Sequence, residues 1–142
     1  MAKRLEICKE LMSYIGTPYH HQARLPGVGL DCAGVPVCIA KKFDLHNGVV
    51  EDMFGYSRIP DGTSLMETLR KGTAKEKSLN ELKIADIILF KFLNNPQHLG
   101  IYMPDNKIIH SYSVIGKVVL HNFDEKWKNR VVSVFEFFNI EE

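Results

Sequence analysis

One cysteine and two histidines have the residue types and the spacing that thiol chemistry requires. Cys32 lies in the stretch GVGLDCAGVPVC, residues 27–38, immediately before a run with helical character. His98 and His110 lie on either side of the turn signal PDNK, in two strand-like runs. A cysteine attacks a carbonyl as the thiolate, so it needs a nearby group that favours loss of its proton. The N-terminus of a helix and a histidine base could both serve.

The two histidines could act as a pair. If their strand-like runs form a hairpin that turns around residues 104–107, His98 and His110 approach each other near the open end of the ladder. One imidazole would take the thiol proton while the other fixes its tautomer and orientation. A single cysteine or histidine is more often structural, so the hypothesis rests on the three residues together.

The other two cysteines predict structure and not chemistry. The three cysteines cannot all pair within one chain, and no Cys-x-x-Cys pair is present to indicate a structural zinc site. Cys8 and Cys38 have apolar neighbours, and free cysteine is commonly buried as a small hydrophobe. We therefore expect both to lie in the core.

Helices are predicted in the first half of the chain. Residues 1–16 have an amphipathic pattern, with apolar residues at helical spacing: Leu5, Cys8, Leu11, Met12 and Ile15. Residues 16–30 are rich in Gly and Pro and predict a surface loop that leads to Asp31. A second helix is expected over residues 33–43, with Pro36 in its first turn.

After the turn-rich residues 44–62, a short helix should begin at Thr63 or Ser64 and end at Gly72. The pattern then changes to strands. The runs KIADIILFKF, HLGIYM, KIIHSY, GKVVLHNF and RVVSVFEFF are β-branched or aromatic and are separated by short turn signals. The sequence thus predicts one α+β domain over residues 1–142, with N-terminal helices packed on a central antiparallel meander of about five strands.

Composition excludes several classes of function. The chain has 142 residues, 45% of them hydrophobic, and a formal net charge of +1. It therefore lacks the basic field that attracts nucleic acid, and no apolar stretch is long enough for membrane insertion. The N-terminal residues also lack the apolar core of a signal peptide, so we expect synthesis in the cytoplasm without an export signal.

The motifs and their order resemble the NlpC-type cell-wall cysteine peptidases, papain-like enzymes that cut peptidoglycan stem peptides. The chain has GTPY, a loop, LDCAG at a helix start, and QHLGIYMPDNKIIHS on a hairpin. In that family an Asp-Cys-Ser-Gly motif carries the nucleophile and a His-Val-Gly-Ile-Tyr motif carries the base. A third polar residue follows about a dozen residues later, as His110 follows His98.

The resemblance implies a papain-like fold and a catalytic set of Cys32 as nucleophile, His98 as general base and His110 as the orienting residue. Its expected substrate is a stem peptide of peptidoglycan, cut at a bond of the γ-D-glutamyl-diaminopimelate type. The loop text GTPYHHQARLPGVGLDCAG is most similar to the branch of phage tail-associated and prophage peptidases. Phage tail proteins are then possible partners, and a tail could carry the domain to the cell wall.

The resemblance also implies residues that border the site. Tyr19 would line the cleft and help to bind substrate or the oxyanion, and His21 is expected at its border. Asp31 matches a residue that in some members receives the free amine of the stem peptide. Ala33 replaces the serine that helps to hold this amine, so a preference for a free L-Ala amine is not supported. His46 and His121 have no motif around them and are expected to be surface or structural residues.

Three alternatives stay open. Zinc could bind to cysteine and histidine ligands, the candidates being Cys32, His20, His21, His98 and His110. These residues lack the short spacing of zinc motifs, so no metal and no cofactor are expected. The domain could instead be a structural or binding part of a tail or effector with weak or lost activity. It could also be a thiol amidase or acyltransferase on another substrate, because related folds catalyse both reactions.

Overall fold

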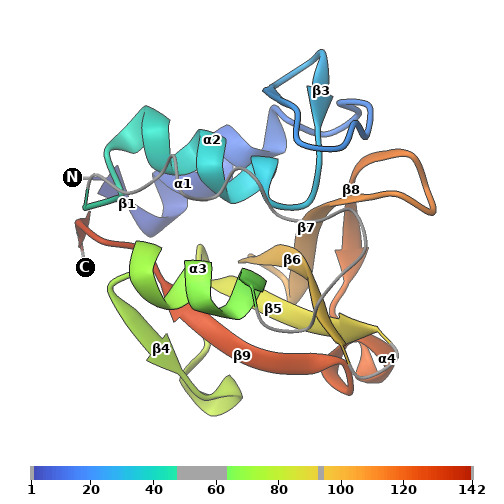
Figure 1. Cartoon of the computed structure of the whole chain (residues 1–142). Coiled ribbons are helices and arrows are strands. Elements are labelled where there is room, and N and C mark those ends of the chain that lie inside the picture. The colour runs from blue at the N-terminus through green and yellow to red at the C-terminus, as the bar shows by residue number, and fades with distance from the viewer. Residues whose placement is uncertain (1, 48–63, 93–94, 142) are drawn as a thin grey trace.

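The computed structural model describes residues 2–47, 64–92 and 95–141. It has the expected α+β fold, built on a six-stranded antiparallel sheet in the order β4-β9-β5-β6-β7-β8. The helices are α1 (Arg4–Met12), α2 (Gly34–Phe43), α3 (Ser64–Gly72) and α4 (Glu125–Lys128). Figure 1 shows α1 and α2 together on one side of the sheet, and α4 at the other end of the molecule. Helix α3 begins at Ser64 and ends at Gly72, as predicted, while Thr63, the other predicted start, lies outside the described residues.

The strands of the sheet are β4 (Lys75–Lys77), β5 (Ile87–Phe92), β6 (Asn95–Met103), β7 (Lys107–Tyr112), β8 (Lys117–Asn122) and β9 (Val131–Glu136). A 3-10 turn covers Leu79–Glu81. Two short pairs lie outside the sheet: β1 (Ala2–Lys3) is parallel to β10 (Ile140–Glu141), and β2 (Arg24–Leu25) is antiparallel to β3 (Gly29–Leu30).

Strands β5 to β8 form the predicted meander, but the last long strand does not continue it. β9 returns to pair with β5, where Ile88 lies between Gly100 of β6 and Val134 of β9. Residues 87–90 of β5 are all buried, which is typical of a strand inside a sheet that is covered on both faces. β4 then adds an unpredicted sixth strand outside β9.

The β6–β7 hairpin has the predicted turn. Met103 pairs with Lys107 and Ile101 with Ile109, so the connection contains only three residues. Asp105 and Asn106 have positive φ angles of 64° and 55°, a conformation that Asp and Asn adopt more readily than most residues. The turn therefore sets the register that brings the later site residues together.

The sheet separates two apolar clusters. Residues from α1, α2 and one face of the sheet form the main core, in which Ile87 and Leu89 alternate with residues on the other face. The second cluster contains Ile88, Phe90, Ile108, Phe123 and Trp127, the last from α4. The two-residue period of a strand assigns successive residues of β5 to different clusters.

Helix α1 is rotated relative to the predicted apolar face. Cys8 and Leu11 are buried as expected, whereas Leu5, Met12 and Ile15 are 67%, 46% and 42% exposed. Ile15 also lies beyond the end of the helix. The reason for the rotation is Arg4, whose side chain is directed inward by buried acidic partners.

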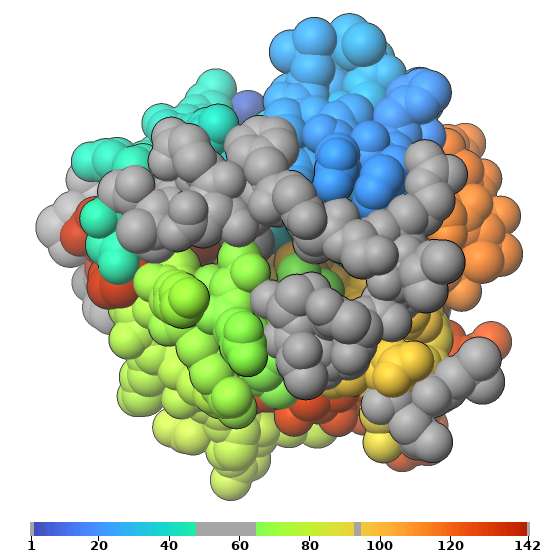
Figure 2. Space-filling view, in the orientation of Figure 1, coloured from blue at the N-terminus to red at the C-terminus, as the bar shows by residue number. Residues whose placement is uncertain are grey.

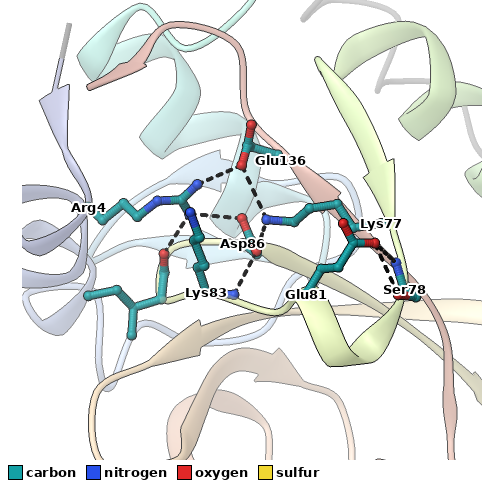
Figure 3. A network of polar contacts seen from close by, with 8 residues as sticks. Arg4, Lys77, Ser78, Glu81, Lys83, Asp86 and Glu136 are labelled. Atoms are coloured by element: carbon teal, nitrogen blue, oxygen red, sulfur yellow. Dashed lines mark hydrogen bonds and ion pairs between the residues drawn. The ribbon is translucent and has the colours of Figure 1, made fainter. Parts of the chain in front are cut away.

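These partners form the ion cluster in Figure 3, defined here as Arg4, Lys77, Asp86 and Glu136. Asp86 is fully buried and lies 2.9 Å from Arg4 Nη1 and 2.6 Å from Lys77 Nζ. Glu136 Oε1 lies 2.7 Å from Arg4 Nη2 and 3.2 Å from Lys77 Nζ. The ion cluster thus joins α1 to β4 and β9.

We expect Asp86→Asn to lower the free energy of unfolding by about 3–5 kcal/mol, because loss of one partner leaves buried cations uncompensated. Urea unfolding followed by circular dichroism measures this change. Lys42→Gln is the control, because it removes an ion pair with Glu10 in which the Lys42 side chain is 52% exposed. A loss for Asp86→Asn no larger than that of this control would contradict the prediction.

Candidate active site

The candidate nucleophile lies where the β2–β3 hairpin passes into α2. Helix α2 begins at Gly34, close to the predicted start, and Cys32 precedes its first turn. The Asp31 carboxylate accepts hydrogen bonds from the backbone N–H of Gly34 at 2.8 Å and of Gln22 at 2.6 Å. The same carboxylate forms an ion pair with Arg24 at 2.8 Å. Asp31 therefore fastens the preceding loop to the helix N-terminus on which Cys32 depends.

The glycine of the LDCAG motif allows this close packing. A Cβ at Gly34 would lie 2.6 Å from the backbone oxygen of Ala23, which is closer than carbon and oxygen can approach. Only glycine therefore lets the loop backbone at Ala23 pack this closely against the start of α2. The thiol of Cys38, one turn further along α2, donates to the Arg24 carbonyl at 3.2 Å and packs against the main core while partly exposed.

The thiol of Cys32 lies against the start of β6. Its Sγ is 4.0 Å from the Gln97 carbonyl oxygen, and it also meets the backbone of Leu99. These two residues flank His98. Burial, with the Asp31 carboxylate as a second cause, raises the pKa of Cys32 to about 12, although the backbone of Leu99 and Ala33 and the Arg24 charge act in the opposite direction. The resting thiol is consequently protonated and requires a base.

The two predicted histidines meet across the hairpin. His98 Nε2 lies 2.7 Å from His110 Nδ1, and both side chains are buried. Both rings lie on the sheet face of the second cluster, with Trp127 6.1 Å from His98 and 5.0 Å from His110 between ring centroids. Gly100 provides space beside them, since a Cβ there would lie 3.1 Å from the Phe90 ring.

Both imidazoles are neutral at neutral pH. Burial lowers the pKa of His98 to about 3, with the Arg130 charge as a second cause. Burial also lowers the pKa of His110 to about 2. In a neutral pair one nitrogen donates and the other accepts, so the contact between His98 and His110 couples the tautomer of one ring to that of the other. The His98 nitrogen outside this contact is Nδ1.

A fourth residue, His121, expected to be a surface or structural residue, joins this group. His121 Nδ1 on β8 lies 3.0 Å from His110 Nε2. No sequence motif surrounds His121. The strand register pairs Ile108 with His121 and His110 with Val119, which places His121 on the same face of the sheet as His110. The signal that could have found it is the strand alternation of KVVLHN combined with a known β7–β8 register.

Tyr19 and His21, two of the predicted binding residues, lie in the lobe formed by residues 16–31, directly before Cys32. Tyr19 bridges to Leu30, two residues before the nucleophile, and its backbone N–H donates to Gly116 at 2.9 Å. Figure 2 shows this lobe, in blue, next to the orange β7–β8 turn. His21 is half-buried in the same lobe, and the roles of Tyr19 and His21 stay predictions. Both oxygens of Asp31 instead accept bonds from the loop and from the first residue of α2.

Two further observations concern the alternatives. Across the parts of the chain that the structure describes, no three His, Cys, Asp or Glu side chains are grouped as metal ligands would be. None of the described helices has the length and apolar character needed to cross a membrane.

Comparison with known proteins identifies the family. The profile of the NlpC/P60 family matches residues 16–136, which includes all the site residues described above. No curated protein matches the chain. Solved structures are similar in fold at low sequence identity.

One similar structure is the NlpC/p60 domain of the peptidoglycan hydrolase SagA, with a TM-score of 0.64 and 17% identity over 94% of this chain and 98% of that one. Another is the peptidoglycan hydrolase RipB from Mycobacterium tuberculosis, with a TM-score of 0.65 and 17% identity over 98% of this chain and 65% of RipB. A lipoprotein-like NLP/P60 family protein from Staphylococcus aureus has a TM-score of 0.66 and 17% identity over 96% of this chain. The chain spans only 41% of that protein.

We expect Asp31→Asn to shift the pH dependence of Cys32 alkylation to lower pH. The Asp31 carboxylate opposes formation of the thiolate, so its removal lowers the pKa of the thiol. Iodoacetamide labelling over a pH series, with mass spectrometry to locate the label, measures the shift. Asp44→Asn is a matched control at an exposed helix end with a φ angle of 57°, which Asn tolerates. A shift to higher pH would contradict the assignment.

The buried imidazoles predict a loss of stability in acid. Below pH 6.5 the unfolded chain protonates His98 and His110, whereas the folded chain, with pKa values of about 3 and about 2, does not. The free energy of unfolding should therefore fall by about 1.4 kcal/mol per pH unit for each ring as the pH decreases. Urea unfolding between pH 7 and pH 4 should show a smaller slope for His110→Gln. His46→Gln, which replaces a half-buried histidine away from the site, should keep the full pH slope of the wild type. Equal slopes for the wild type, His110→Gln and His46→Gln would refute the prediction.

Proposed function

Because the chain belongs to the NlpC/P60 family, we propose that it is a cysteine peptidase that hydrolyses peptide bonds in the stem peptides of peptidoglycan. The observation that carries this proposal is the Cys32 thiol at a helix N-terminus, against the backbone on both sides of His98. The His98 ring is in turn held by His110 at 2.7 Å. Nucleophile, base and orienting residue thus come from one helix end and one hairpin.

The proposed reaction follows from these positions. His98 Nδ1 takes the proton of Cys32 as the sulfur attacks the peptide carbonyl, which gives a tetrahedral oxyanion. The backbone N–H of Cys32, directly before the first turn of α2, is the proposed oxyanion donor. Collapse of this intermediate expels the amine with the proton from His98. Water, activated by the same imidazole, then hydrolyses the thioester.

The substrate proposed is an internal bond of the γ-D-glutamyl-diaminopimelate type. Asp31 is 1% exposed and bound to Arg24 and two backbone amides, and Ala33 has no hydroxyl. These residues offer nothing to a free N-terminal amine of the stem peptide. We therefore propose that cleavage does not depend on that amine. The role in a phage tail, with tail proteins as partners and carriage to the cell wall, is a proposal supported by the loop text alone.

Cys32→Ala should abolish cleavage, because the Cys32 thiol contacts the strand backbone beside His98, whereas the Cys38 thiol contacts the Arg24 carbonyl. Purified peptidoglycan and defined stem peptides, with and without a free L-Ala amine, would be incubated with each protein and analysed by mass spectrometry. New fragments with the wild type alone would establish a thiol peptidase and identify the bond.

Cys38→Ala is the matched control from the same helix. It should remain active and lose about 1 kcal/mol of stability, the typical cost of one hydrogen bond from a partly exposed side chain. If Cys38→Ala were inactive and Cys32→Ala active, the nucleophile would be wrongly assigned. If the wild type produced no fragments and Cys32 did not react with iodoacetamide, the proposal of an enzyme would be withdrawn.

A further inference from the structure

Three imidazoles form one hydrogen-bonded chain across three neighbouring strands. His98 Nε2 contacts His110 Nδ1 at 2.7 Å, and His110 Nε2 contacts His121 Nδ1 at 3.0 Å. We call this group the imidazole chain. In each contact the Nε2 of one ring faces the Nδ1 of the next, so all hydrogen bonds of the imidazole chain run in the same direction.

That direction determines the tautomer of every ring. If His98 Nδ1 is the base for Cys32, the His98 proton resides on Nε2 and is donated to His110 Nδ1. His110 must then carry its own proton on Nε2 and donate it to His121 Nδ1. His121 is therefore the acceptor that fixes His110, just as His110 fixes His98.

The two ends of the imidazole chain differ in their surroundings. His98 and His110 are buried beside Phe92, Tyr112 and Trp127, where a positive charge is poorly solvated. His121 is partly exposed, and the Asp124 carboxylate opposes the effect of burial on its pKa. A proton that enters the chain at His98 is thus more stable at His121.

We propose that His121 is a positioning residue of the active site, which sets the tautomers of His110 and His98 and holds the proton that Cys32 releases. This inference rests on the proposed function only for Cys32 as the nucleophile. Each transfer is balanced. The Cys32 proton moves to His98 Nδ1, the His98 Nε2 proton moves to His110 Nδ1, and the His110 Nε2 proton moves to His121 Nδ1.

The result is a thiolate at Cys32, two neutral rings and an imidazolium at His121. The three transfers run in reverse when the leaving amine takes its proton from His98. No oxidant, metal or added base takes part.

The same chain predicts inhibition by acid. When solvent protonates His121, its Nδ1 becomes a donor, and both inner rings must reverse their tautomers. His98 Nδ1 then carries a hydrogen and cannot accept the thiol proton. The titratable and charged groups around His121 are His110 and Tyr112 of β7, Asp124 before α4, and Arg130 beyond the Trp127 ring.

The test uses alkylation of Cys32 by iodoacetamide, which needs no cell-wall substrate. The amide oxygen of His121→Asn can accept the bond from His110 but cannot hold a proton. We expect its alkylation rate near neutral pH to fall roughly tenfold, as for loss of a supporting partner. The acid limb of its pH profile should move to lower pH. His121→Leu, which can neither accept nor hold a proton, should react still more slowly.

His46→Asn, a histidine outside the imidazole chain, should match the wild type. Wild-type rates and profiles for His121→Asn would overturn the proposal, whatever the result for His121→Leu. Nitrogen-15 spectra of the wild-type imidazoles test it without a variant, because all three rings should be protonated at Nε2 at neutral pH. A wild-type Cys32 no more reactive than Cys8 would instead refute the proposed function.

Discussion

A buried imidazole is stable only if its ring nitrogens find partners, and this requirement organises one face of the sheet. His98 and His110 are both buried, and each uses the other as a partner at 2.7 Å. The pair must therefore lie on adjacent strands in a fixed register, with small or aromatic residues around it. Gly100, Tyr112 and Trp127 meet that need. The second apolar cluster thus serves to keep two neutral rings in place.

The loop before α2 has a similar constraint at its centre. Asp31 is almost fully buried, and its carboxylate binds Arg24, Gln22 and Gly34 through separate contacts. This one side chain fixes the start of α2 while placing a negative charge beside Cys32. The first effect supports the site, whereas the second raises the pKa of the thiol. The base at His98 is needed because local structure alone does not ionise the cysteine.

Local signals in the sequence were sufficient for most elements. Pro36 in a first turn, the PDN turn and the alternating strand runs predicted α2, the β6–β7 hairpin and the α+β class. The contact between His98 and His110 also followed, because both residues lie on one hairpin with a short turn. These features depend on residues close together in the chain, where propensity and spacing are informative.

Contacts between distant segments required the tertiary structure. The inward side chain of Arg4, the return of β9 to β5 and the place of His121 in the imidazole chain each depend on partners far away in the sequence. A strand pattern gives the face of a residue only after its register is known, and a one-residue slip would send His121 to the other face. The sequence by itself determined the elements and the residue types that could react. The tertiary structure alone decided which of them are neighbours, because register and buried charge pairing are properties of the whole fold.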